Sequence, residues 1–192
     1  MAKRPFKFPR ILAESAAIFL GVLLAFVVEQ WREDLNERRE AEATLNLVRA
    51  ELTQNLAELE AIAPLRSDML KEFEEAIMVL KNENRFPDNF PAFRSPDITS
   101  IAYELATDSG AVTGVPPKDL LIMARAYEAL EEVRRNDTFL NERNAQIRFN
   151  DGEQYISGFI YYLNRAKMNE PVAINHVRAA IEALDARNGQ ID

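Results

Sequence analysis

The stretch ILAESAAIFLGVLLAFVVEQW, residues 11–31, is the most apolar part of this chain. Between Ile11 and Val28 the only polar side chains are those of Glu14 and Ser15. An α-helix rises ~1.5 Å per residue, so these 18 residues would cover about 27 Å, close to the roughly 30 Å hydrocarbon core of a bilayer. The sequence therefore predicts a transmembrane helix over residues 11–31.

The residues on either side of this stretch agree with a membrane anchor. Phe6, Phe8 and Trp31 flank it, as aromatic residues do at membrane interfaces. The net charge of the chain is −8, yet residues 1–10 carry +4 and residues 29–192 carry −11. Because an excess of Lys and Arg marks the cytoplasmic side, we expect a cytoplasmic basic leader over 1–10 and a periplasmic domain over 32–192, in a bacterial inner membrane. The acidic domain argues against nucleic acid as a partner.

A cleavable signal peptide is the alternative interpretation of the same stretch. Its apolar region would be about 7–15 residues long and would end in small residues of the A-x-A type. Here the run ends in Ala25-Phe26-Val27-Val28-Glu29-Gln30, which offers no such site. The sequence therefore favours an uncleaved anchor.

Small residues recur every four positions along the predicted membrane helix. Ala17, Gly21 and Ala25 share one stripe, and Glu14 borders it. Such a stripe lets a second helix approach closely, although Ala and Gly are common in membrane helices in any case. Glu14 is either a boundary residue whose side chain reaches the interface or a contact to a cation on another subunit. The stripe predicts docking against another membrane protein or a second copy.

A second helical segment follows without interruption. Residues 32–62 contain no Gly or Pro, and Pro64 is the first break. An apolar seam runs along this segment at residues Leu45, Val48, Leu52, Asn55, Leu59 and Ile62. Packing within the chain is the favoured interpretation; in a coiled coil with a partner helix, Asn55 would set the register.

The rest of the chain reads as short helices joined by proline-rich connections. Ser67 is a candidate N-cap, Pro96 is expected to open a short helix with Ile101 and Leu105 facing inward, and Pro171 is expected near the start of the last helix. No alternating run between hairpin turns is present. The predicted class is all-α, with the membrane helix continuing into a long helix and then a helical bundle of six or seven helices in all.

The segment 82–97, NENRFPDNFPAFRSPD, contains three prolines and three phenylalanines. Its prolines exclude a long helix or a central strand. The phenylalanines either fix this loop to the core, which is the commoner case, or present an apolar patch to a partner.

Two segments resemble a group of uncharacterised bacterial single-span membrane proteins. The first comprises Glu14, Gly21 to Ala25, Glu29 and Trp31, followed by the E-L-x-x-N pattern of Glu51-Leu52-Thr53-Gln54-Asn55. The second, looser match is Tyr103 to Ala111, YELATDSGA. The resemblance implies a membrane anchor with a helical outer domain and no assigned activity.

Little in the sequence suggests catalysis. The chain has no Cys and one His, His176, which excludes the usual zinc ligand sets and leaves a triad without a convincing base. No glycine-rich phosphate-binding pattern occurs. We therefore expect no enzyme activity, no cofactor and no metal.

Two function classes remain. The first is a non-catalytic accessory or assembly subunit of a membrane protein complex, with membrane lipid and either other subunits or a second copy as partners. The alternative is a periplasmic ligand-binding or sensor module that acts through a separate membrane partner, because the ten residues before the span leave no room for an output domain.

Overall fold

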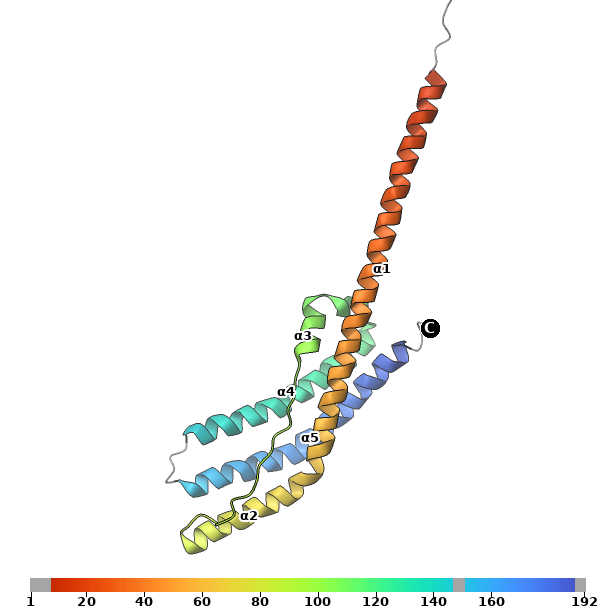
Figure 1. Cartoon of the computed structure of the whole chain (residues 1–192). Coiled ribbons are helices and arrows are strands. Elements are labelled where there is room, and N and C mark those ends of the chain that lie inside the picture. Colours follow the sequence, from red (N-terminus) through yellow and green to blue (C-terminus); the bar gives the residue numbers. More distant parts are fainter. Residues whose placement is uncertain (1–7, 147–150, 189–192) are drawn as a thin grey trace, which may run out of the picture. The chain divides into compact units, whose positions relative to one another are not determined.

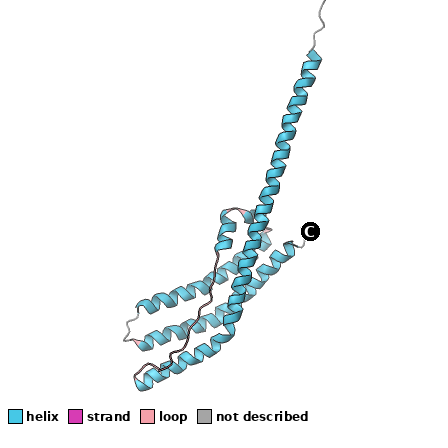
Figure 2. Cartoon of the chain, viewed as in Figure 1, coloured by secondary structure: helices cyan, strands magenta, loops and turns pink. Residues whose placement is uncertain are grey.

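The computed structural model describes residues 8–146 and 151–188, and within these ranges it leaves out the side chains of residues 8–14, 16, 17, 114, 144, 146 and 188. The described residues form helices, turns and loops without a strand (Figure 2), which confirms the all-α class. The chain divides into two compact units, Met1–Ala43 and Thr44–Asp192.

Helix α1 (Phe8–Ile62) accounts for all of the described part of the first unit and continues into the second. It is uninterrupted over 55 residues, as expected from the absence of helix breakers in residues 32–62. It ends where Pro64 stands at the start of a short 3-10 helix, η1 (Ala63–Leu65). The predicted break at this proline is confirmed.

The second unit places α2, α5 and α4 side by side (Figure 1). Helix α2 (Arg66–Glu83) ends at Asn84, whose left-handed backbone (φ 52°) lets its N–H bond to the Leu80 carbonyl oxygen at 3.0 Å. Helix α5 (Gly152–Asn188) contacts both α2 and α4 (Pro117–Gln146). Their shared core contains the following buried side chains: Leu70, Phe73, Leu140, Ile156, Phe159, Tyr162 and Leu163.

A long connection without regular structure leads from α2 to α3 (Ile101–Asp108). We call residues 84–100 the strap. After α3, Gly110 has a φ of +75°, a conformation that glycine adopts without strain. The short 3-10 helix η2 (Ala111–Gly114) then leads to α4.

Several boundaries differ from the sequence-based expectations. The described residues contain five α-helices and two 3-10 helices, fewer α-helices than expected. The sequence Asn136-Asp137-Thr138 leaves open whether a helix ends there or runs on, and α4 runs on through it. Pro171 lies inside α5 and does not start a separate helix. The structure also corrects the expected cap at Ser67, since α2 begins at Arg66 without a side-chain cap.

The short helix α3 is the largest correction. It begins at Ile101, five residues after Pro96, and not at the proline. Ile101 and Leu105 are 73% and 50% exposed, so both face outward. The buried residue of this helix is Ala106, and Ala102 and Tyr103 are half-buried.

Candidate functional site

The first unit presents a continuous apolar helix surface. From Ile18 to Val28, every large hydrophobic side chain is between 44% and 69% exposed. Trp31 is 64% exposed. Among the described residues, no helix combines the length and hydropathy needed to cross a membrane.

Part of the predicted packing stripe lies outside the described residues. Phe6 precedes them, and the side chains of Phe8, Glu14 and Ala17 are not among those described. Gly21 lies in α1 with open space where a Cβ would stand, since no neighbouring atom comes within 4 Å of it. Ala25 is exposed. The surface around these two residues is therefore free within the described chain.

The predicted seam on α1 has a different outcome. All six of its side chains, Leu45, Val48, Leu52, Asn55, Leu59 and Ile62, are at most 4% exposed. They are buried by the chain itself, as packing within the second unit requires. A partner helix would find no exposed surface on this seam.

Asn55 and Glu51 on α1 hold the end of the strap and the start of α3. The Asn55 side chain donates to the Thr99 carbonyl oxygen at 2.8 Å and accepts from the Thr99 N–H at 3.1 Å. Glu51 accepts from the N–H groups of Ala102 (2.8 Å) and Tyr103 (3.4 Å). Because these N–H groups belong to the first turn of a helix, they would otherwise lack partners.

Tyr127 on α4 completes this arrangement from the other side. Its hydroxyl donates to Glu51 Oε1 at 2.7 Å, and its ring stacks on that of Tyr103 at a centroid distance of 4.0 Å. Desolvation and the neighbouring Glu51 carboxylate raise the pKa of Tyr127, so the phenol remains protonated. The two segments quoted for the family resemblance, around Glu51 and Tyr103, are therefore in direct contact.

Phe93 of the strap packs against the core, as the commoner alternative predicted, whereas Phe86 and Phe90 keep 42% and 39% of their surface exposed. Phe93 contacts Phe159 and Tyr162, each at a centroid distance of 5.0 Å, and Phe90 contacts Phe73 at 5.6 Å. The aromatic face of α5 around residues 155–162 is thus occupied by the protein's own rings.

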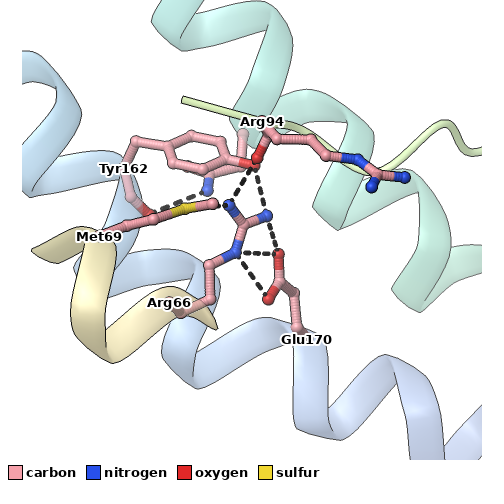
Figure 3. A network of polar contacts seen from close by, with 6 residues as sticks. Arg66, Met69, Arg94, Tyr162 and Glu170 are labelled. Atoms are coloured by element: carbon pink, nitrogen blue, oxygen red, sulfur yellow. Dashed lines mark hydrogen bonds and ion pairs between the residues drawn. The ribbon is translucent and has the colours of Figure 1, made fainter. Parts of the chain in front are cut away.

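A buried polar cluster lies beneath the strap (Figure 3). We call Arg66, Asp137, Tyr162 and Glu170 the Arg66 cluster. Arg66, Tyr162 and Glu170 are labelled in Figure 3, and each is 1% exposed. Arg66 Nε donates to Glu170 Oε1 at 2.9 Å and to Oε2 at 3.0 Å, and its Nη2 also bonds to Glu170. Its Nη1 donates to the carbonyl oxygen of Arg94 in the strap at 2.8 Å. One guanidinium therefore connects α2, α5 and the strap.

Burial controls the protonation of this cluster. Desolvation raises the pKa of Glu170, against the opposing effect of Arg66. Desolvation likewise raises the pKa of Asp137, while hydrogen bonding from Tyr162 and Ser95 and the charge of Arg66 oppose it. With its three hydrogen bonds from Arg66, we assign Glu170 as the ionised partner of the pair.

The polar groups described above form hydrogen bonds within the chain and stabilise its fold. The Glu51 and Glu170 carboxylates are saturated by donors from the chain itself. No set of three or more His, Asp or Glu side chains in the described ranges is arranged for a metal ion. His176, half-buried on α5, belongs to neither cluster.

Sequence reasoning missed the Arg66–Glu170 pair, whose members are 104 positions apart. A signal existed for Arg66, because it precedes Leu70 by four residues and Phe73 by seven and so continues the apolar stripe of α2. Glu170 carried the same signal, because it follows Leu163 by seven residues and precedes Val177 by seven on an apolar stripe.

No protein-family model, curated protein or solved structure matches this chain.

Proposed function

We propose that this chain is a non-catalytic accessory subunit that is anchored in a bacterial inner membrane and docks on other subunits of a membrane protein complex or on a second copy of itself. The observation that supports this most is the 18-residue run from Ile11 to Val28, with one acidic residue within it. The basic leader and the aromatic residues at both ends give further support. In this topology, residues 1–10 are cytoplasmic and residues 32–192 are periplasmic.

The apolar side chains of α1 suit lipid better than water. Ile18, Phe19, Leu20 and Val28 lie on different sides of the helix, and all four are more than half exposed. A soluble helix normally buries one apolar stripe and exposes a polar face. A helix that is apolar on every side needs an apolar environment, and lipid provides it.

The contacts within the second unit favour a non-catalytic role. Its buried carboxylates bind its own donors, and its aromatic face is filled by strap residues such as Phe93. The sensor alternative needs a ligand site in this unit, and the aromatic face of α5 around residues 155–162 is occupied by the protein's own rings. We therefore favour the accessory subunit.

Anchoring is tested by washing membranes that contain the full chain with carbonate at high pH, and by fusing a reporter after Asp192. We expect the chain to stay with the membrane and the reporter to be active only outside the cytoplasm. Release by carbonate would contradict the anchor, and a cytoplasmic reporter signal would reverse the topology.

Docking is tested separately, with Gly21→Ile and the matched control Val22→Ile on the neighbouring face. We expect Gly21→Ile to reduce the recovery of co-purifying membrane protein, or of a differently tagged second copy, because a large side chain keeps another helix away. The control should leave recovery unchanged. Equal recovery with both variants would contradict docking through this face.

A further inference from the structure

The strap turns back along α2 (Figure 1), and a groove lies between the two segments. We call it the strap groove. Its volume is about 380 Å³, which lies within the range of about 300–1,000 Å³ that is usual for ligand sites. Most of the residues that line it are apolar: Ala76 and Val79 of α2, and Pro87, Phe90, Pro91 and Ala92 of the strap.

The walls of the strap groove are fixed by the core of the second unit. The ring of Phe90 packs edge-on against that of Phe73, at a centroid distance of 5.6 Å. Ala76 is only 4% exposed, and Pro87 and Pro91 restrict the backbone of the strap. Because these walls exist before a partner arrives, binding there costs little conformational entropy.

Two carboxylates also line the strap groove, those of Glu72 and Glu75. They are three residues apart on α2 and therefore share one face of the helix. Both residues are exposed, and neither has an ion-pair or hydrogen-bond partner within the described ranges. The exposed basic residues of α2 and the strap pair with other acids: Lys71 with Asp68, Lys81 with Glu153, Arg85 with Glu83 and Arg94 with Glu58. The negative charge of the groove is therefore not compensated by the described part of the chain.

This combination of apolar surface and negative charge fits a basic partner. A Lys or Arg side chain would meet two carboxylates, and the ring of Phe90, which is 39% exposed, attracts a cation placed over its face. A second copy of this chain is a poor match, because residues 29–192 carry −11 and would bring further negative charge. The charges therefore favour a different protein as the occupant.

We propose that the strap groove binds a basic segment of another subunit: its Lys or Arg side chain pairs with Glu72 and Glu75, and a neighbouring apolar side chain lies against Phe90 and Val79. This inference rests on the docking role proposed above and deepens it, because it names the chemistry of the partner and its place on the second unit. Such a contact combines apolar burial, which supplies affinity, with opposite charges, which select the partner.

The test measures the binding of labelled peptides to the full chain in non-ionic detergent micelles by fluorescence anisotropy, with empty micelles as the blank. The probe is a short peptide of glycine and serine that carries two arginines and two leucines, and its counterpart has glutamate in place of both arginines. We expect the arginine peptide to bind, more tightly at low salt than at high salt, and the glutamate peptide not to bind. Equal binding of both peptides, or binding of neither, would overturn the proposal.

The double variant Glu72→Gln with Glu75→Gln locates the binding. We expect it to weaken the affinity for the arginine peptide about tenfold, because two partly exposed ion pairs are lost. The matched control is Glu74→Gln with Glu128→Gln, which removes the same charge from two exposed glutamates outside the strap groove and should change the affinity by less than about twofold. Equal losses in the two double variants would show a general attraction to an acidic protein and would overturn the proposal.

The variant Ala92→Trp tests the apolar part of the contact. Ala92 is exposed and lines the strap groove, so a larger side chain there occupies the space that the partner needs. We expect the arginine peptide to lose its affinity while the thermal midpoint of the chain stays close to that of wild type. An unchanged affinity in the folded variant would overturn the proposal.

Photo-crosslinking to the wild-type chain gives a readout that needs no variant. A photoreactive leucine in the arginine peptide should attach to α2 or the strap, and attachment mainly elsewhere would overturn the proposal. A second copy as the occupant would appear as self-association that Ala92→Trp removes, and that result would also overturn it. None of these outcomes depends on the carbonate wash, the reporter or Gly21→Ile, so a failure here is distinct from a failure of the membrane anchor or of docking through it.

Discussion

Replacing Glu51 by Gln should remove a large part of the stability of the second unit. Each Glu51 oxygen accepts from two donors: Oε1 from Tyr127 and Tyr103, and Oε2 from Ala102 and Thr99. An amide keeps one acceptor oxygen and turns an NH₂ group towards the other pair of donors. Hydrogen bonds to a charged group contribute about 1.5–3 kcal/mol each. Because the contacts to Tyr103 and Thr99 are long, at 3.4 Å, we expect a total loss of about 3 kcal/mol.

Thermal unfolding of the full chain, followed by circular dichroism, measures this loss. In a domain of this size about 3 kcal/mol lowers the midpoint by about 6–12 °C. Hydrogen exchange should show the amides of Ala102 and Tyr103 losing protection first. Glu60→Gln is the control, because Glu60 forms only an exposed pair with Arg178 and should change stability by less than about 1 kcal/mol. A midpoint for Glu51→Gln within about 2 °C of wild type would contradict the stabilising role of the Glu51 carboxylate.

Three further predictions concern packing and the buried ion pair. Gly152→Ala places a Cβ 2.5 Å from Phe86 Cζ, so proteolysis in the strap should become faster and stability should fall by about 1–3 kcal/mol; an unchanged cleavage rate would contradict the contact. Leu52→Asp puts a charge at a position that is 0% exposed and should abolish the protease resistance of the second unit, whereas a resistant variant would mean that the seam is not buried. Arg66→Met should lower the free energy of unfolding by about 3–5 kcal/mol, because it leaves Glu170 buried and unpaired. The double variant Arg66→Met with Glu170→Met should recover most of this stability. Urea unfolding measures both, and losses that simply add in the double variant would contradict a paired role.

Periodicity predicted the parts of the fold that depend on one helix at a time. The seam from Leu45 to Ile62 and the break at Pro64 follow from local spacing, because every turn of a helix returns the same face to the core. Local rules failed where packing overrides them. Pro171 sits inside α5, although proline normally opens or ends a helix.

The polar contacts could not be predicted in the same way. The sequence marked Asn55 for its place on the seam, yet its role is to hold Thr99, which is 44 positions away. The Glu51–Tyr127 bond spans 76 positions and the Arg66–Glu170 pair 104. Such pairings depend on how the helices pack against one another, and the residue pattern of a single helix does not predict that packing.

The anchoring of the strap has a consequence for the order in which this protein folds. Its contacts come from α1 through Asn55, from α2 through Arg66 and from α5 through Phe159, so the strap can close only after these three helices have met. Chain closure over such sequence distances is slow. Until it is complete, the rings beneath the strap face water, and the newly made chain is at its most prone to aggregate.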